Sequence, residues 1–233
     1  RRAAVPAVPV LVPVPLLTLV LLLVLLLAQG CGEPRFTYVK NGGERTYFKV
    51  PNGWHRIGQH DMDDLLSGDD PDSAAARARP KSSWSVGYDA SRPPDPTHLF
   101  GLGGDEEPFA YAQIRRLSDE ARDQVSLNVL RDAFLPVTAE SRRQAVKEHR
   151  PLTGFELVRD QVLTPGGGLR GVRSVFNYRI GQQLLLQTFD VTTYAADDGR
   201  LYQLVVSCSA RCYQERSAEL DAVARSFTVR RHR

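Results

Sequence analysis

Residues 169–208 read LRGVRSVFNYRIGQQLLLQTFDVTTYAADDGRLYQLVVSC, and they form the most regular part of the sequence. Runs rich in apolar, β-branched and aromatic residues follow one another in and just before this stretch: 157–164, 169–180, 184–194 and 201–208. Short links containing Gly, Pro, Gln and Asp separate the runs, and such links join antiparallel neighbours in a sheet. The pattern predicts an antiparallel meander of four strands.

Alternating residues of the last run give this sheet an apolar face: Tyr202, Leu204, Val206 and Cys208. The run 169–180 repeats the pattern, interrupted by Ser174, through Val172, Phe176, Tyr178 and Ile180. Such a face needs a cover, because burial of apolar surface drives folding. A helix predicted over 213–225 supplies the cover through residues spaced along one side: Tyr213, Leu220, Val223 and Phe227.

The sequence before the meander adds further strands. The runs 36–40 and 46–50 flank Asn41-Gly42-Gly43, which is typical of a β-hairpin turn. Two more strands are predicted over 83–89 and 109–115. Strands mixed with a few helices predict an α+β fold.

Polar segments and two helices lie between these strands and the meander. Residues 58–81 read as an exposed acidic insertion with room for one short helix, and the Pro- and Gly-rich residues 92–108 read as a loop. One helix is predicted from Ser118 to Pro136, with one face formed by Ala121, Val125, Val129 and Ala133. A second, very polar helix is predicted over 139–149 at the surface.

Two short motifs at the ends of this region resemble a known family. Tyr47-Phe48-Lys49-Val50-Pro51-Asn52-Gly53-Trp54 is similar to the opening strand and turn of PsbP-like proteins, and Leu220-Asp221-Ala222-Val223-Ala224-Arg225-Ser226-Phe227 is similar to their closing helix. This family includes many actinobacterial lipoproteins and shares its fold with a Ran-binding import factor. The resemblance implies an α/β/α sandwich with a central antiparallel sheet over residues 36–229, used for binding rather than catalysis.

The N-terminal segment differs in composition from the rest of the chain. Residues 1–30 contain no acid, their only bases are Arg1 and Arg2, and Leu16 to Ala28 is an unbroken apolar run. A basic start, a short apolar run and small residues before a cleavage point are typical of a secretory signal peptide. Because a membrane-spanning helix needs about 20 apolar residues, we expect cleavage rather than a single-pass anchor, although the uncleaved anchor stays an alternative.

Cys31 indicates which kind of signal this is. Leu27-Ala28-Gln29-Gly30-Cys31 resembles a bacterial lipobox, although the family pattern prefers Leu and a small residue where Ala28 and Gln29 stand. The resemblance implies that Cys31 is lipidated and anchors the domain to the cell membrane on its extracytoplasmic face, with residues 31–35 as a short linker. The alternative is an ordinary secretory signal with Cys31 as an unmodified thiol.

The other two cysteines fit an exported protein. Cys208 and Cys212 are separated by three residues, and an oxidising compartment favours a disulfide between them. The same spacing would suit half of a metal site, but no second Cys or His pair of usable spacing is present.

Composition and motifs restrict the function. The 233 residues carry 30 basic and 27 acidic side chains, and a net charge of +3 is too small to indicate nucleic-acid binding. No nucleophile elbow or phosphate-binding loop occurs, and no cofactor is predicted. His55, His60, Asp61 and Asp63 are the candidate metal ligands, but their spacing matches neither a helical His pair nor a calcium loop.

Two function classes follow from these observations. The first is a non-enzymatic lipoprotein that binds a protein, peptide, lipid or wall component of the cell envelope. The second is an envelope hydrolase that uses the His55/His60/Asp cluster, with His98, His149 and His232 standing alone. A basic tail, residues 230–233, could contact anionic headgroups of a nearby membrane.

Overall fold

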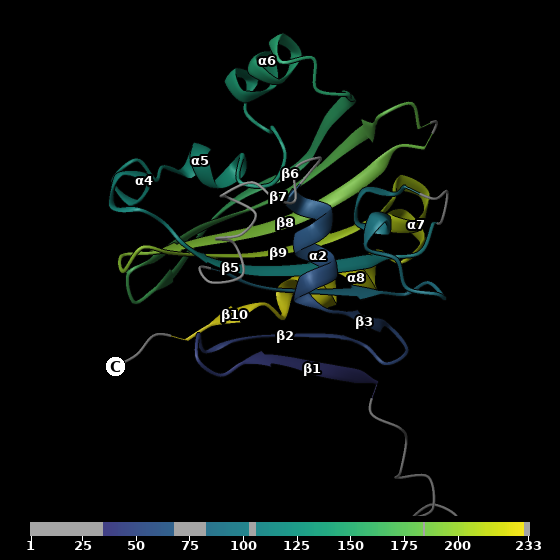
Figure 1. The fold of residues 1–233 in the computed structure, drawn as a ribbon, viewed down its shortest axis with the longest axis horizontal. Coiled ribbons are helices and arrows are strands. Elements are labelled where there is room, and N and C mark those ends of the chain that lie inside the picture. The colour runs from purple at the N-terminus through teal and green to yellow at the C-terminus, as the bar shows by residue number, and fades with distance from the viewer. Residues whose placement is uncertain (1–34, 68–82, 103–105, 184, 231–233) are drawn as a thin grey trace, which may run out of the picture. The chain divides into compact units, whose positions relative to one another are not determined.

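A computed structural model describes residues 35–67, 83–102, 106–183 and 185–230 (Figure 1). Their strands form two antiparallel sheets, with the orders β3-β4-β5-β9-β8-β7-β6 and β1-β2-β10. The strands are β1 (Phe36–Asn41), β2 (Thr46–Pro51), β3 (His55–Ile57), β4 (Ser83–Asp89), β5 (Phe109–Arg116), β6 (Leu152–Gly166), β7 (Leu169–Ile180), β8 (Gln187–Ala196), β9 (Arg200–Ser209) and β10 (Thr228–Val229). The predicted hairpin, the two strands that follow it and the four-strand meander are confirmed.

Both faces of the seven-stranded sheet are covered. Helix α8 (Ser217–Arg225) and the small sheet pack on one face through Phe48, Trp54, Leu220 and Val223. Helix α2 (Gln59–Ser67), the 3-10 helix η2 (Pro96–Phe100) and α5 (Leu127–Arg131) lie on the other, where α2 crosses in front of the strands in Figure 1. Helices on both sides of an antiparallel sheet make an α/β/α sandwich, as expected.

The prediction that β7 and β9 share one apolar face is wrong. Strand register pairs Phe176 with Phe189 and Phe189 with Ser207, so Phe176 faces the same side as Ser207 rather than Val206. Tyr202, Leu204, Val206 and Cys208 do pack under α8, together with Leu220, Val223 and Phe227. Phe176 and Tyr178 lie in the core on the opposite, α2 face. The apolar residues of β9 are therefore covered by α8, and those of β7 are covered by the elements on the α2 face.

Two predicted helices are each divided in the structure. The helix expected from Ser118 to Pro136 is α4 (Asp119–Asp123) followed by α5, because the Ser126 side chain accepts a hydrogen bond from the Val129 N–H and caps a new helix. The helix expected over 213–225 is α7 (Ala210–Glu215) followed by α8. The predicted surface helix is α6 (Ala139–Lys147).

The polar insertion is more ordered at its start than the sequence indicates. Met62 and Asp63 of α2 are buried against the sheet, so this part is not an exposed loop, while residues 68–82 lie outside the described residues. The loop 92–108 contains η2, whose Leu99 is fully buried. Arg230, the first residue of the predicted basic tail, donates its backbone N–H to Arg45 and stacks on the Tyr47 ring.

Candidate functional site

A row of polar side chains crosses the α2 face of the large sheet. The register places Ser85 of β4 opposite Gln113 of β5, Gln113 opposite Gln203 of β9, and Gln203 opposite Thr193 of β8. Because paired residues share a face, the four side chains form a line across the strands. Ser85, Gln203 and Thr193 are buried, and the row separates the core around Phe176 from a smaller core under α5.

Hydrogen bonds fix this row. The Gln203 amide donates to Thr193 Oγ1 at 3.1 Å, the Ser85 hydroxyl donates to Asp63 Oδ1 at 3.2 Å, and the Tyr111 hydroxyl donates to Gln113 Oε1 at 2.5 Å. The Gln113 amide nitrogen makes no hydrogen bond with another described residue. Gln113 is only partly buried, so an amide N–H without a protein partner at this position is a donor available to a ligand.

A pocket of about 650 Å³ opens over Tyr111, Gln113 and Gln203 of this face. Its volume is within the roughly 300–1,000 Å³ range of small-molecule sites. The apolar part of its lining comes from α2, from η2 and the residues just after it, from the segments around residues 134 and 151, and from the end of β7: Leu66, Phe100, Leu102, Phe134, Leu135, Leu152 and Ile180. The pocket therefore combines a polar floor with apolar walls.

The pocket wall formed by the segment around Phe134, which faces η2, is held in place by several contacts. The Asp132 carboxylate accepts hydrogen bonds from the backbone of Val137 and Thr138, at 2.7 and 2.8 Å. Phe134 stacks on Phe100 with ring centres 5.8 Å apart, and the Tyr178 hydroxyl donates to the Pro136 carbonyl at 2.6 Å. Burial raises the pKa of Tyr178 to about 12, against the opposing effect of the positive charges of Arg142 and Arg150. This side of the pocket is preformed.

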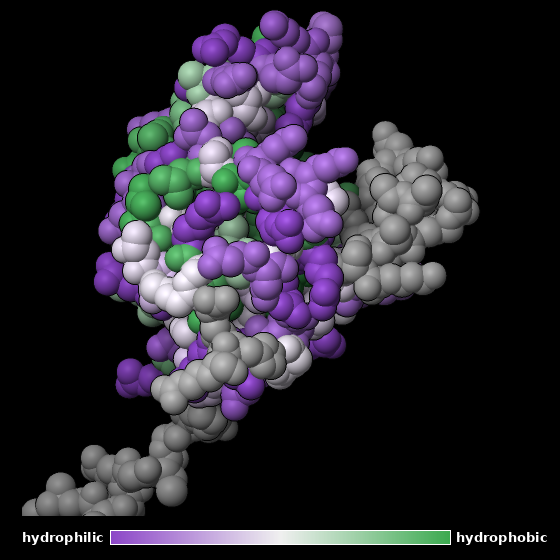
Figure 2. Space-filling view, turned by 90° about the vertical axis from the view of Figure 1, so that its left-hand side faces the viewer, coloured by the Kyte–Doolittle hydropathy of each residue, from purple (hydrophilic) through white to green (hydrophobic). Residues whose placement is uncertain are grey.

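Basic residues mark the edge of the pocket. Arg115, Arg116 and Arg150 line it, whereas none of its described lining residues is acidic. Arg150 is exposed, whereas Arg116 pairs in register with Arg200, so its side chain belongs to the α8 face of the sheet. Figure 2, which views the side of the molecule that carries α4 and α5, shows hydrophobic residues uncovered between hydrophilic ones.

The structure does not assemble the candidate metal ligands into a site. His55 Nε2 accepts a hydrogen bond from Arg92 Nε at 2.6 Å, while His60 lies 3.5 Å from Asp64 at the exposed side of α2. Asp63 turns inward to Ser85, and Asp61 is exposed. Among the described residues, no three His, Cys, Asp or Glu side chains are grouped as metal ligands.

His98 is not the isolated surface histidine that the sequence predicts. Its Nδ1 lies 2.8 Å from Asp89 Oδ2, and the Asp89 side chain is completely buried. The same carboxylate accepts hydrogen bonds from the backbone N–H groups of Ser91 and Asp95, both at 2.9 Å. Asp89 thereby organises the loop that carries η2 and one wall of the pocket.

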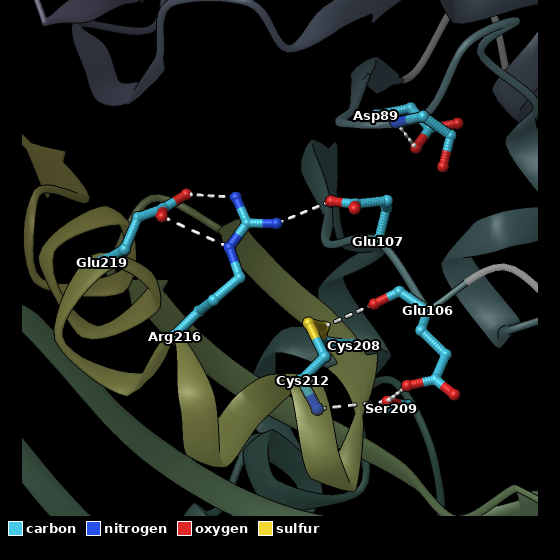
Figure 3. A network of polar contacts seen from close by, with 9 residues as sticks. Asp89, Glu106, Glu107, Cys208, Ser209, Cys212, Arg216 and Glu219 are labelled. Atoms are coloured by element: carbon cyan, nitrogen blue, oxygen red, sulfur yellow. Dashed lines mark hydrogen bonds and ion pairs between the residues drawn. A yellow bond between two sulfur atoms is a disulfide. The ribbon is translucent and has the colours of Figure 1, made fainter.

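The predicted cysteine pair lies at the end of β9. The sulfur atoms of Cys208 and Cys212 are within bonding distance, and their Cα atoms are 5.8 Å apart. Figure 3 shows the surrounding polar contacts: Arg216 lies between Glu107 and Glu219, and Ser209 contacts Glu106. The predicted lipidation site, Cys31, lies outside the described residues. In the described part of the chain, we find no helix long and apolar enough to cross a membrane.

Comparison with known proteins gives a fold but no close relative. No protein-family model and no curated protein matches the chain. The solution structure of cyanobacterial PsbP from Synechocystis sp. PCC 6803 is similar with a TM-score of 0.51 and 14% identity, over 86% of this chain and 96% of the other. The chain therefore has a PsbP-like fold, as the sequence motifs indicated.

Two further structures are similar at lower scores. LpqN of Mycobacterium tuberculosis, which is involved in cell envelope biogenesis, gives a TM-score of 0.45 and 15% identity over 86% of this chain and 93% of the other. The Ran-binding protein Mog1p of Saccharomyces cerevisiae gives 0.42 and 11%, over 83% and 95%.

Proposed function

Given a PsbP-like fold with a ligand-sized pocket on one sheet face, we propose that this protein is a membrane-anchored, extracytoplasmic lipoprotein that acts as a non-enzymatic binding module of the cell envelope. The pocket is the main observation that supports a binding role. Amide, phenol and guanidinium groups line it beside apolar side chains, and these groups hold ligands by hydrogen bonds, charge and burial. The apolar residues 16–28, the Gly30-Cys31 motif and the Cys208/Cys212 pair support export and anchoring.

Lipidation is tested by metabolic labelling. The full chain is expressed in a bacterium that processes lipoproteins, with a radiolabelled fatty acid in the medium, beside Cys31→Ala and the double variant Cys208→Ala/Cys212→Ala. We expect label and membrane association in the wild type and in the double variant, and loss of both in Cys31→Ala. Equal labelling of all three proteins would reject Cys31 as the anchor.

The binding role is tested by filling the pocket. Ala133 lines it, and a tryptophan there occupies part of its volume. Full-length wild type, Ala133→Trp and the control Ala139→Trp, at the exposed start of α6, are purified from membranes, and bound small molecules are identified by mass spectrometry. We expect a compound that is retained by the wild type and the control and depleted in Ala133→Trp. The same small-molecule content in all three would contradict the proposal.

A further inference from the structure

The small sheet turns one face to the core and the other outward. Val39 of β1 pairs with Phe48 of β2, and both side chains are buried in the core under α8. Because side chains alternate along a strand, Tyr38 and Lys40 point the opposite way, and both are exposed. Strand register and ring contacts assign seven residues to this outer face: Phe36, Tyr38, Lys40, Tyr47, Lys49, Thr228 and Arg230.

Aromatic rings and cations alternate on the outer face, and none of its seven residues is acidic. Tyr38 is 67% exposed, and it is the only aromatic among the exposed large hydrophobic side chains of the described residues. Lys49 Nζ lies 4.1 Å from the centre of the Phe36 ring. The Arg230 guanidinium carbon lies 5.1 Å from the centre of the Tyr47 ring. The face therefore presents positive charge next to amphipathic rings.

The same face is hollowed at the end of the β1–β2 hairpin. The hollow measures about 980 Å³, and none of its described lining residues is acidic. Glu44, the acidic residue of the hairpin turn, lies 2.6 Å from Arg200 and is thereby paired with another cation. Four members of the outer face line the hollow: Tyr38, Lys40, Tyr47 and Arg230. A concave surface lined by rings and cations is complementary to protruding anionic groups.

The outer face begins next to the predicted anchor. Phe36 is its first member, and only residues 32–35 separate Phe36 from Cys31. Because an extended chain advances at most about 3.6 Å per residue, Phe36 lies within about 18 Å of that cysteine. β1 is the edge strand of the small sheet and the lowest strand in Figure 1. So short a tether raises the effective concentration of the membrane surface at this face.

We infer that the outer face of the small sheet docks on an anionic phospholipid surface. Tyrosine rings are enriched at the level of the head groups, and Lys and Arg side chains are attracted to anionic lipids. The inference rests on the proposed membrane anchoring and is independent of the pocket on the α2 face. It concerns a folded surface, to which the predicted basic tail contributes only Arg230.

The test measures how fast single lysines react with an amine-specific reagent. The full chain is purified from membranes and reconstituted in nanodiscs of phosphatidylcholine, or of phosphatidylcholine with phosphatidylglycerol, and labelled peptides are quantified by mass spectrometry. We expect phosphatidylglycerol to slow the labelling of Lys40 and Lys49 at least about fivefold, the effect of one cation near an anionic surface. Lys147, exposed on α6 at the opposite end of the described fold in Figure 1, should label equally in both discs.

Variants of β1 test whether this face causes the protection. Tyr38→Glu/Lys40→Glu leaves Lys49 as the reporter, and Lys49 should then label in phosphatidylglycerol discs as fast as in phosphatidylcholine discs. The control Arg143→Glu/Val146→Glu makes the same change in net charge at exposed positions of α6, and it should keep the wild-type protection. Lys40→Arg, which keeps the charge, should also keep the protection of Lys49.

The possible outcomes separate docking from anchoring. Equal labelling of Lys40 and Lys49 in both kinds of disc would overturn the docking face and leave the anchor, because the chain would still elute with the discs. A chain that does not elute with either disc would overturn both proposals. Protection of the two lysines by inorganic phosphate in phosphatidylcholine discs would overturn the lipid surface as the partner and assign a site for small anions.

Discussion

At the scale of single residues, Asp89 is the buried charge on which the loop after β4 depends. Its two carboxylate oxygens accept hydrogen bonds from the Ser91 and Asp95 backbone and lie against the His98 ring. An ionised carboxylate is stable in the core only with such partners. The loop in turn carries Phe100 and Leu102 into the pocket wall.

Asp89→Asn should therefore destabilise the protein with little change in volume. The amide NH₂ would replace one acceptor by a donor that faces the donors of Ser91, Asp95 or His98, and an unsatisfied buried pair of this kind costs about 2 to 3 kcal/mol. Urea unfolding measures the loss, and Asp61→Asn at the exposed side of α2 is the control. A free energy of unfolding equal to the wild type would show that these hydrogen bonds do not stabilise the loop.

The same residue shows where sequence reasoning ends. Asp89 closes a strand that the sequence predicts correctly, but its partner His98 lies nine positions further along an irregular loop. Hydrophobic periodicity places residues on faces of helices and strands and says nothing about side chains brought together by a loop. The sequence therefore predicts a lone surface histidine at position 98, although the His98 side chain is only 12% exposed.

At the scale of elements, the Cys208/Cys212 pair joins the last residues of β9 to the first turn of α7. Cys208 is fully buried in the core beneath α8, and Ser209 between the cysteines caps α7 by accepting a hydrogen bond from the Cys212 N–H at 3.2 Å. Glu106, from the segment before β5, accepts a hydrogen bond from Ser209 (Figure 3) and others from Arg211. A covalent link and a cap thus define the same turn.

Removing this link should lower stability by a modest and calculable amount. A disulfide stabilises the folded state by restricting the unfolded chain, and for so short a loop the chain-entropy relation gives a stabilisation of about 2 kcal/mol. We expect Cys208→Ala/Cys212→Ala to lower the free energy of urea unfolding by about that value. Dithiothreitol should shift the wild-type curve toward that of the variant and leave the variant unchanged. A wild-type curve insensitive to the reductant would contradict a disulfide at this position.

Helix boundaries were the elements least visible in the sequence. Ala121, Val125 and Val129 repeat at helical spacing, yet Ser126 starts a new helix, and Val129 is left 45% exposed. The cap is a local hydrogen bond that competes with the periodic pattern, and the periodicity alone favours one long helix. Strands were predicted more closely, because their turns carry explicit Gly, Asp and Asn signals.

At the scale of the whole molecule, the sequence predicts the sandwich but not the pocket. The strands follow from local patterns, whereas the polar row joins Ser85, Gln113, Gln203 and Thr193 from four strands through their register. Within each strand, a single polar residue on one face looks like an ordinary interruption. Only the pairing of the strands shows that the interruptions align.

Tyrosines are buried on both faces of the large sheet, and their ionisation makes the free energy of unfolding depend on pH in the alkaline range. Tyr178 lies on the α2 face and Tyr202 on the α8 face, and burial raises the pKa of each to about 12. Tyr213, which donates a hydrogen bond to the buried Asp190 at 2.8 Å, also has a raised pKa because of burial and that neighbouring carboxylate. In the unfolded chain these phenols ionise near pH 10.

We therefore expect the free energy of unfolding to fall as the pH rises from about 10 to about 12. In that window the unfolded state loses tyrosine protons that the folded state keeps, so the unfolded state binds fewer protons and gains relative stability. Urea unfolding at a series of pH values, followed by tyrosinate absorbance and circular dichroism, measures the effect. Tyr178→Phe should reduce the pH dependence, and Tyr38→Phe, at a side chain that is 67% exposed, should leave it as in the wild type. A flat profile across the window would mean that the tyrosines ionise equally in both states, and that burial on the two faces does not protect them.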